Sequence, residues 1–393
     1  MEVDLSMENF IYQNPTKIIF GRQTQYEVGN EVAKFGKKVL LHYGGSSIKR
    51  SGLYDVVMTS LKEKKIEVIE LGGVVPNPRL SMVNEGIKLC KENNIDFILA
   101  VGGGSVIDSA KAIAAGVKYD GDVWDFFSKG IVCQDSLPYG TILTLPATGT
   151  EMNPRCVITK DDTLEKRGSS FLNPSFSILN AELCATLPRN QVANGVVDML
   201  AHLFERYFTN TTDVEITDRM IEGVMKTIIE LGEDVYKDPS DYEKYSQIMW
   251  AGTVAHNFSL CVGRETDWAT HQIEHELSGM YDVAHGAGLS VLFPAWMKYV
   301  YKHDINRFAM FAHRVMNVEI DYFDLEKTAY QGILAVEEFY KKLDMPLTLK
   351  DLDIPESSID ELASNTTRNG KITQGNFVKL DTADIKEILL LAR

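Results

Sequence analysis

The chain has 393 residues, which is enough for two domains that each bury a core of their own. Its composition, 45% hydrophobic and 24% charged, is typical of a globular protein. The formal net charge of -15 argues against nucleic acid and anionic membrane surfaces as partners. The sequence contains no run of about 18 apolar residues, so it predicts no membrane span.

The cysteines and the N-terminus predict a cytoplasmic protein. The five cysteines are scattered and form no CxxC pair, which argues against a disulfide framework and against a structural zinc knuckle. The first ten residues lack the basic stretch and the apolar run of a signal peptide.

In the first half of the chain, short apolar runs alternate with amphipathic stretches. The runs predict strands over residues 37–43, 66–71, 97–101, 140–145 and 176–179. The stretches predict helices over residues 54–64 and 83–93, and from the glycine turn at 102–105 to about Gly116. This alternation implies a parallel sheet with right-handed crossover helices, so every strand-to-helix turn lies on one edge of the sheet. Ligands bind at that edge in folds of this kind.

The pattern changes near Pro188 and becomes helical almost to the end of the chain. The clearest predicted helices cover residues 192–207, 215–231, 242–260, 268–280 and 288–301. Pro188 lies near the start of the first of these helices, where proline is tolerated. Pro294 lies inside the last one and should kink it. We therefore expect an α/β domain over residues 1–188 and an all-helical domain over residues 189–393.

The turn Gly102-Gly103-Gly104-Ser105 follows a predicted strand and opens a predicted helix. Glycines let the backbone approach a phosphate, and the free N–H groups and dipole of a helix start favour an anion. A glycine run alone most often makes only a tight turn. The strand before it and the helix after it favour a pyrophosphate site.

A second turn, Gly44-Gly45-Ser46-Ser47, follows the predicted strand 37–43. Enzymes that prefer NAD often carry an acidic residue here for the ribose 2′-hydroxyl, but this turn is followed by Lys49 and Arg50. A 2′-phosphate would find hydroxyl and basic partners, which favours NADP(H) over NAD(H). The alternative is that both basic residues only form a solvated helix start.

Two further segments fit the same edge of the sheet. Asn77 lies in a rigid turn, residues 75–78, that could border an adenosine. The polar loop 144–151 could offer hydroxyls to a ribose or to the nicotinamide. Either segment alone would be interpreted as a structural turn.

One carboxylate and three imidazoles in the second half, Asp198, His202, His271 and His285, predict a site for a divalent metal. Asp198 and His202 project from one helix face among apolar neighbours, where an unpaired carboxylate is costly. A capped or salt-bridged aspartate is the alternative for Asp198 alone. Mixed oxygen and nitrogen ligands suit Fe(II) and Zn(II) alike, and the lack of cysteine argues against a thiolate-zinc arrangement.

His275 shares a helix face with His271 but would be a fifth protein ligand. We assign it to the rim of the site, as a polar or proton-relay group. The remaining histidines are interpreted as structural or surface residues: His42, His256, His303 and His313. A metal site together with a nucleotide turn indicates redox chemistry on a small oxygenated molecule.

These residues together resemble the iron-containing (metal-dependent, group III) alcohol dehydrogenase family, in particular its butanol dehydrogenase branch. The resemblance runs nearly end to end, through residues 10–21, 102–111, 148–153, 193–202 and 271–299. Its most specific part is the block Val283-Ala-His-Gly-Ala-Gly-Leu-Ser followed by Phe293-Pro-Ala-Trp-Met-Lys.

The resemblance implies a Rossmann-like dinucleotide-binding domain, an all-α metal-binding domain in a dehydroquinate synthase-like architecture, and a catalytic cleft between them. It implies that Asp198, His202, His271 and His285 are the metal ligands and that His275 lies near the nicotinamide. For the cofactor it implies Gly103, Gly104, Ser105 and Asp108 on the pyrophosphate and nicotinamide side, the loop residues Thr144, Thr148 and Asn153, and Lys166 at a ribose. It also implies a homodimer paired through the N-terminal strand region.

We therefore expect a metal-dependent, NAD(P)-linked alcohol dehydrogenase and aldehyde reductase for small primary alcohols, such as butanol, and the matching aldehydes. The alternatives are a metal-dependent, NAD-using lyase or cyclase that binds an anionic sugar acid, a polyol dehydrogenase on the same fold, and a non-catalytic nucleotide and metal sensor. A sugar acid would need several Lys and Arg. The metal segments are instead flanked by Trp268, Met280, Tyr281, Phe293 and Trp296, which favour a small apolar substrate unless they belong to the core.

Overall fold

The structure, a computed structural model, describes residues 6–393, and these divide into two compact units. The sheet unit comprises residues 13–187 and 238–253. The helical unit comprises the described residues before Gln13 together with residues 188–237 and 254–393. As a boundary between independently folding domains, residue 188 stays a prediction.

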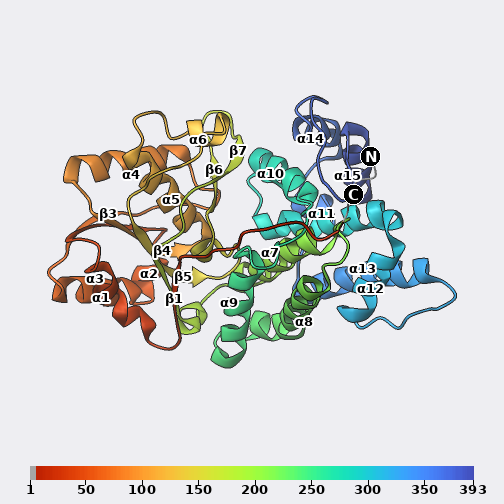
Figure 1. Cartoon of the computed structure of the whole chain (residues 1–393), viewed down its shortest axis with the longest axis horizontal. Helices are drawn as coiled ribbons and strands as arrows, with labels where there is room; N and C mark the ends of the chain where they lie inside the picture. Colours follow the sequence, from red (N-terminus) through yellow and green to blue (C-terminus); the bar gives the residue numbers. More distant parts are fainter. Residues whose placement is uncertain (1–5) are drawn as a thin grey trace. The chain divides into compact units, whose positions relative to one another are not determined.

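Six parallel strands form the sheet of the sheet unit, in the order β1-β8-β5-β4-β2-β3 (Figure 1). This confirms the predicted parallel sheet. The strands are β1 (Lys17–Phe20), β2 (Lys38–Tyr43), β3 (Glu67–Leu71), β4 (Phe97–Gly103), β5 (Tyr139–Leu145) and β8 (Phe176–Leu179). The sequence pattern does not predict β1, an edge strand of four residues of which none is fully buried, whereas β8 has the same length and is buried throughout.

Helices cover both faces of this sheet (Figure 1). On one face, Val39 and Leu41 of β2 pack in a core with Val57 and Leu61 of α3. The opposite face meets α5, because His42 of β2 bonds Ser109 of that helix. The helices of this unit are α1 (Val28–Val32), α2 (Ser47–Arg50), α3 (Leu53–Glu63), α4 (Leu80–Asn93), α5 (Gly104–Lys118) and α6 (Asp125–Ser128). Burial on both faces explains the continuous apolar runs of the central strands.

The order of the strands creates a ligand-binding edge. β2 lies between β3 and β4, with His42 opposite Leu71 on one side and Tyr43 opposite Val101 on the other. The chain therefore reverses direction across the sheet at β2. The carboxyl ends of β2 and β4 form a topological switch point, which is where open α/β sheets bind their ligands.

A two-stranded antiparallel sheet of β6 (Arg155–Thr159) and β7 (Lys166–Ser170) adds to this unit. The sequence does not predict it, because β7 is short and polar and has no alternating apolar pattern. It is tied to the turn at residues 75–78, since the Thr159 N–H donates to the Pro78 carbonyl at 2.9 Å.

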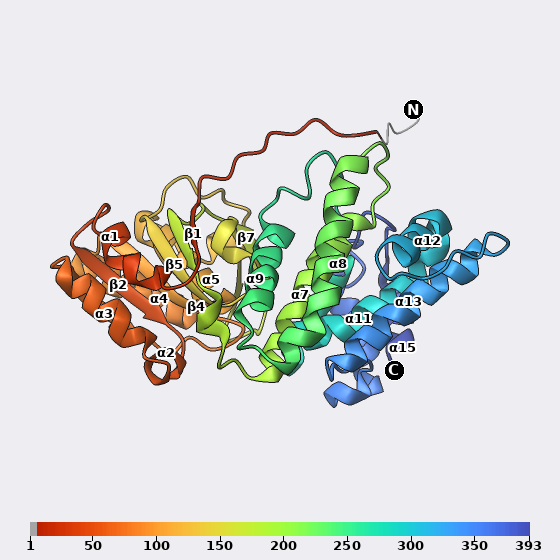
Figure 2. The same cartoon turned by 90° about the horizontal axis from the view of Figure 1, so that it is seen from below.

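The helical unit contains the predicted helices with shifted ends. They are α7 (Arg189–Tyr207), α8 (Glu215–Lys237), α10 (Ala269–Tyr281) and α11 (His285–Val300), while α9 (Tyr242–His256) lies mostly in the sheet unit. α7 and α8 run side by side (Figure 2). α11 continues through Pro294 as one helix. None of the helices among residues 6–393 is long and apolar enough to cross a membrane.

Four further helices complete this unit: α12 (Ile305–Arg314), α13 (Leu325–Lys342), α14 (Ile359–Thr366) and α15 (Thr382–Leu391). Their bounds are not predicted from the sequence, although its helical pattern extends almost to the end of the chain.

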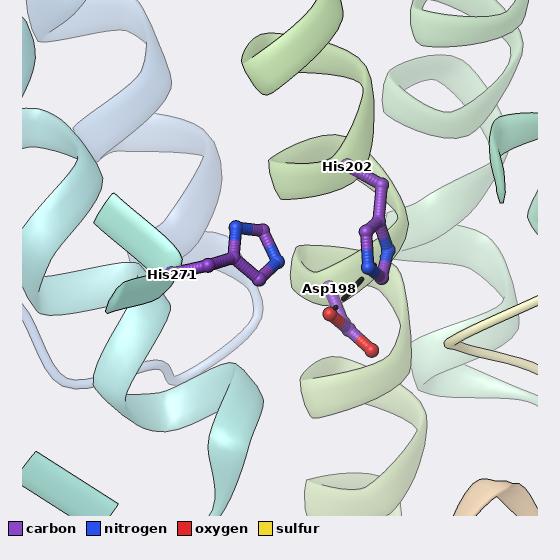
Figure 3. A group of neighbouring side chains, drawn as sticks. All are labelled: Asp198, His202 and His271. Carbon is purple, nitrogen blue, oxygen red and sulfur yellow. Dashed lines mark ion pairs between the residues drawn. The ribbon is translucent and has the colours of Figure 1, made fainter. Parts of the chain in front are cut away.

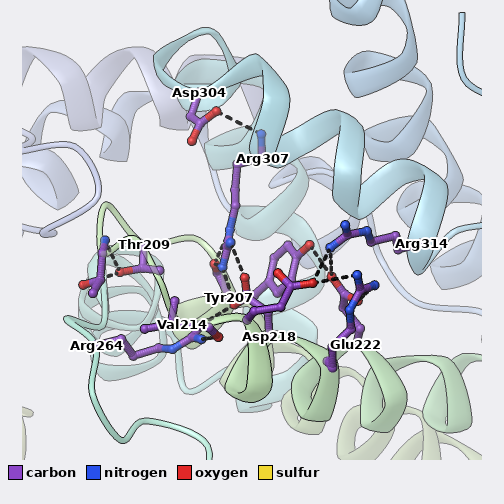
Figure 4. A network of polar contacts seen from close by, with 12 residues as sticks. Tyr207, Thr209, Val214, Asp218, Glu222, Arg264, Asp304, Arg307 and Arg314 are labelled. Atoms are coloured by element: carbon purple, nitrogen blue, oxygen red, sulfur yellow. Dashed lines mark hydrogen bonds and ion pairs between the residues drawn. The ribbon is translucent and has the colours of Figure 1, made fainter. Parts of the chain in front are cut away.

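A buried ionic network joins three helices of the helical unit with the segment before α10 (Figure 4). Asp218 of α8 accepts hydrogen bonds from Arg307 at 2.5 and 2.7 Å and lies 2.7 Å from Arg264. The two guanidinium groups also donate to carbonyls at the C-terminal end of α7, those of Arg206 and Tyr207. Helix ends leave carbonyls without intrahelical partners, so the network caps α7 and ties it to α8 and α12.

Candidate functional site

Three of the four predicted ligands come together in the helical unit (Figure 3). Asp198 and His202 lie one turn apart on α7, and His271 lies in the first turn of α10. One potential ligand atom of each lies within 4.8 Å of the others. All three side chains are buried, with 3%, 5% and 4% of their surface exposed. A carboxylate and two imidazoles so close together are donors of the kind that could hold a divalent cation.

The fourth predicted ligand, His285, is the first residue of α11. Its Nε2 lies 3.6 Å from Asp198 Oδ1, the same separation as that between His202 Nδ1 and Asp198 Oδ1. Asp198 is therefore the common neighbour of both imidazoles. The ring of His275 lies 5.8 Å from that of His285, at a half-buried position beside the cluster.

Two buried glutamates contact the histidines from the far side. His271 Nδ1 lies 2.7 Å from Glu205 Oε1, and His285 Nδ1 is hydrogen-bonded to Glu274 Oε2. Glu205 also accepts the backbone N–H groups of Trp268 and His271 at 2.5 and 3.1 Å. No sequence pattern predicts either glutamate as part of the site. Glu205 sits in the turn after His202, but a glutamate on a helix is too common for its position alone to be a signal.

The environment of the cluster keeps an imidazole in its metal-binding form. Burial lowers the pKa of His202 well below its usual value, and nearby His271 and Arg206 lower it further. The ring of His256, interpreted from the sequence as structural or surface, is buried 4.1 Å from that of His202. Arg206 donates to His256 Nδ1 and to the His202 carbonyl. The residues present thus fit a divalent metal, because neutral imidazoles and a carboxylate converge in a buried site.

The aromatic residues near the cluster have two different roles. Phe293 and Trp296 are fully buried in the core of the helical unit. Trp268 is partly exposed, and its ring lies 5.1 Å from that of His271 and 6.1 Å from that of His202. Trp268 therefore supports the predicted apolar lining, whereas Phe293 and Trp296 belong to the core.

The candidate cofactor residues lie in the sheet unit, most of them at the carboxyl ends of neighbouring strands. Gly44 to Ser47 follow β2, Asn77 follows β3, and Gly103 to Asp108 span the end of β4 and the start of α5. Thr144 is the next-to-last residue of β5, Thr148 and Asn153 lie in the loop after it, and Lys166 begins β7. The parallel order β2, β4, β5 places the turns that follow these strands on one edge.

The start of α5 offers unsatisfied backbone donors. Its N-cap is Gly103, which has no side chain to accept a hydrogen bond from the first turn. A Cβ on Gly104 would lie 2.8 Å from Thr148 Oγ1, so glycine here lets the loop after β5 lie against the helix start. These free N–H groups and the helix dipole fit a phosphate.

The loop after β5 is held by a buried lysine. Lys111 Nζ donates to the carbonyls of Asn153 and Arg155 at 2.8 and 2.6 Å. Asp108 accepts from the Thr150 hydroxyl at 2.6 Å and the Val157 N–H at 2.8 Å, and burial raises its pKa. Asn153 is fully buried, and its amide donates to the Gly149 carbonyl at 2.8 Å. These residues shape the loop around the start of α5.

The turn after β2 is mostly exposed, with Gly45, Ser46 and Ser47 on the surface. Arg50 donates to the Ser46 hydroxyl. Lys49 Nζ lies 4.7 Å from the ring centre of Tyr54. Arg50 therefore lies beside a hydroxyl group of the turn, whereas Lys49 lies over the ring of Tyr54. No carboxylate belongs to the turn itself, which fits a 2′-phosphate.

Comparison with known proteins gives the class of the chain. Residues 15–181 match the iron-containing alcohol dehydrogenase family, and residues 192–392 match the C-terminal region of the Fe-containing alcohol dehydrogenase family. The chain is 46% identical over 388 residues to "Probable NADH-dependent butanol dehydrogenase 2" of Bacillus subtilis, covering 98% of this chain and 99% of the relative. It is 36% identical to the NADPH-dependent aldehyde reductase YqhD of Escherichia coli, covering 96% and 98%.

A solved structure agrees with this assignment. The crystal structure of NADH-dependent butanol dehydrogenase A from Thermotoga maritima is similar with a TM-score of 0.94 and 43% identity, covering 98% of this chain and 99% of that one. The chain therefore belongs to the iron-containing alcohol dehydrogenase family, in its butanol dehydrogenase branch. It is accordingly an oxidoreductase of the alcohol dehydrogenase class.

Proposed function

We propose that the chain interconverts small primary alcohols, such as butanol, and their aldehydes, with a divalent metal held by Asp198, His202, His271 and His285. The observation that carries the proposal is the buried cluster in which one potential ligand atom each of Asp198, His202 and His271 lies within 4.8 Å of the others. Family membership supports Fe(II), and the same donor set also suits Zn(II).

When bound, the metal would act as a Lewis acid on the substrate oxygen, and a nicotinamide would carry the hydride. Asp198 supplies the one anionic group of the ligand set. Burial keeps His202 neutral, as a metal ligand requires. The ring of Trp268 lies 6.1 Å from the imidazole of His202 and 5.1 Å from that of His271, and it adds apolar surface beside them. His275, half-buried beside His285, would pass the alcohol proton to solvent through its imidazole nitrogens.

Loss of the ligands tests this function. We expect Asp198→Ala and His271→Ala to lose bound metal, measured by elemental analysis of protein purified without air. Changes to residues that only orient a metal ligand usually lower activity about 10–100-fold. Because these two variants each lose a ligand itself, we expect a larger decrease in the rate of butanal reduction. His313→Ala, an exposed histidine of α12, is the control and should keep metal and turnover. Ligand variants that retain both metal and full activity would contradict the proposal.

We propose further that NADP(H) is the preferred coenzyme. It would be bound by Gly44, Gly45, Ser46, Ser47, Asn77, Gly103, Gly104, Ser105, Asp108, Thr144, Thr148, Asn153 and Lys166. The support is the turn after β2, where Arg50 meets the Ser46 hydroxyl and the turn carries no carboxylate. Some relatives are named as NADH-dependent and others as NADPH-dependent, so family membership alone does not determine the coenzyme preference.

Paired assays with NADH and NADPH test the coenzyme preference. A charge-assisted hydrogen bond is worth about 1.5–3 kcal/mol, so kcat/KM should favour NADPH by about tenfold or more. Arg50→Ala should reduce this ratio with little effect on the NADH reaction, whereas Lys62→Ala, in the last turn of α3, should leave it unchanged. An equal or higher kcat/KM with NADH would contradict the preference.

We propose finally that the protein is a cytoplasmic homodimer paired through its N-terminal strand region. β1 is an edge strand, and the segment before it exposes Phe10, Ile11 and Tyr12. Light scattering after size exclusion would give the mass in solution, and a monomeric mass for the full chain would exclude the dimer.

A further inference from the structure

One buried carboxylate of the helical unit has no part in the proposed ligand set. Glu274 lies on α10, three residues after His271, and is fully buried. Its Oε2 accepts a hydrogen bond from Nδ1 of His285, the first residue of α11. We propose that Glu274 is a positioning residue that fixes the tautomer and orientation of His285 for metal binding. The proposal rests on the proposed metal centre.

The tautomer follows from the hydrogen bond. An imidazole that donates its Nδ1 proton carries its lone pair on Nε2, and Nε2 is the atom of His285 that lies 3.6 Å from Asp198 Oδ1. Metal-ligating histidines usually donate their other ring N–H to a carboxylate or carbonyl, which orients the ring and raises its basicity. His271 shows the same arrangement, with Nδ1 2.7 Å from Glu205.

The space for this carboxylate is provided by a glycine. A Cβ on Gly288, one turn along α11 from His285, would lie 2.8 Å from Glu274 Cγ and 3.0 Å from its Oε1. A buried carboxylate costs free energy that an apolar side chain of similar size would not, so packing alone does not account for Glu274. Its hydrogen bond to His285 gives it a function in the site.

Glu274 is the better of the two glutamates for a test. Glu205 also accepts two backbone N–H groups at the start of α10, so its removal disturbs the helix as well as His271. For Glu274, the experiment must exclude another role, which is direct ligation of a metal ion. Glu274, His275 and His285 each offer a ligand atom within 4.8 Å of the others, so Glu274 could instead bind a second metal ion directly.

The experiment compares metal binding in the full-length protein and its variants. Metal-free protein is titrated with Zn(II) against a chromogenic chelator, and Co(II) is added separately to record the absorption bands of the bound ion. We expect one metal per wild-type chain. Glu274→Gln and Glu274→Ala should bind Zn(II) about 10–100-fold more weakly and shift the Co(II) bands. Glu274→Asp keeps the carboxylate and should lose less affinity than Glu274→Gln.

Glu230→Gln is the matched control, because Glu230 is an exposed glutamate of α8 in the same unit. It should bind Zn(II) as the wild type does. A purely structural role would lower the melting temperature of the metal-free Glu274 variants without moving the Co(II) bands. If the Glu274 variants do not fold, Gly288→Ala tests the same contact by displacing the carboxylate, and it should also weaken Zn(II) binding.

The outcomes separate this proposal from the proposed function. Wild-type affinity and unchanged Co(II) bands in folded Glu274→Gln and Glu274→Ala would overturn the role of Glu274 and leave the metal centre intact. Two metal ions per chain, one lost on changing Glu274 and one on changing Asp198, would overturn it in favour of direct ligation. A wild-type chain that binds no divalent metal would overturn the proposed function and this inference together.

Discussion

A buried histidine in the central sheet makes the stability of the molecule sensitive to pH. His42 is fully buried in β2, with Nδ1 2.9 Å from the Leu71 carbonyl and Nε2 2.9 Å from the Ser109 hydroxyl. Neutral imidazole satisfies this pair, because it donates from one nitrogen and accepts at the other. Burial lowers the pKa of His42 to about 4. This agrees with its interpretation from the sequence as a structural residue.

The shift in the pKa of His42 predicts how stability changes with pH. Above pH 6.5 the imidazole is neutral in both folded and unfolded chains, so its contribution is fully present. Between pH 6.5 and about 4 the unfolded chain binds a proton that the folded chain does not, and stability falls by about 3 kcal/mol across this window. Urea unfolding from pH 7.5 to 4.5 should show a smaller loss for His42→Gln than for the wild type. Equal losses would contradict the prediction.

The residues of the candidate site differ in how far the sequence predicts them. Asp198 and His202 have a helical spacing that the sequence displays, and His271 joins them in one cluster. Glu205 and Glu274 act on histidines of other helices, so no local spacing marks them. The position of His256 beside the site is not predicted from the sequence either, because its ring approaches that of His202 only in the folded helical unit.

At the scale of elements, the start of α5 depends on the loop that lies over it. A Cβ on Gly104 would lie 2.8 Å from Thr148 Oγ1 and 3.1 Å from its methyl carbon, so the loop would have to move. We expect Gly104→Ala to raise the KM for the coenzyme by about tenfold, a loss of ~1.4 kcal/mol of binding. Combining it with Thr148→Ala should cost less than the two single changes added together, because the second change removes the clash.

Gly223→Ala is the control for that comparison. Gly223 lies within α8 and a Cβ there would meet nothing within 4 Å, so the change should leave the KM for the coenzyme unaltered. Additive effects of Gly104→Ala and Thr148→Ala would show that the contact between helix and loop is unimportant for binding.

The network around Asp218 makes a second prediction about elements. Asp218→Asn would leave the buried guanidinium groups of Arg264 and Arg307 without their carboxylate. Removing one partner of a buried ion pair typically costs about 3–5 kcal/mol, so we expect a loss of that size in denaturant unfolding. Glu338→Gln, which removes the exposed pair with Lys341, should change stability little. A loss no larger than that of the control would contradict the structural role of Asp218.

The sequence predicts several long, buried elements closely, although it does not delimit α12 to α15. β4 and α8 are predicted almost to the residue at their starts, because a continuous apolar run and a helical period mark them. The shorter elements β1 and β7 escape prediction. β1 is held in place by pairing with β8, a partner more than a hundred residues away in the sequence. Such long-range pairing leaves no local signal.

At the scale of the whole molecule, the units are not continuous stretches of chain. The sheet unit needs the segment 238–253, which contains most of α9. The Thr253 hydroxyl donates to the buried carboxylate of Glu151 at 2.6 Å, and the ring of Trp250 packs against that of Phe20 at 6.2 Å. α9 is therefore part of the core of the sheet unit.

This division predicts the behaviour of fragments. We expect the fragment 13–187 to be unstable alone and to be stabilised by a peptide of residues 238–253. At a peptide concentration 100 times its Kd, the gain should be about 2.7 kcal/mol. A Thr253→Val peptide should bind more weakly, because Glu151 loses its hydroxyl donor. Thermal unfolding of the fragment with each peptide measures this, and no stabilisation by the wild-type peptide would contradict it.

The position of α9 in the sequence also determines when the last segment of the sheet unit is synthesised. Residues 188–237, which belong to the helical unit, leave the ribosome after the strands of the sheet unit but before α9. At roughly 5–20 residues per second, the nascent sheet unit waits several seconds for its last helix. During that interval the buried Glu151 lacks its hydroxyl donor Thr253, and Phe20 lacks its contact with Trp250. The nascent chain therefore exposes an incomplete surface to chaperones for the time that translation takes to reach Thr253.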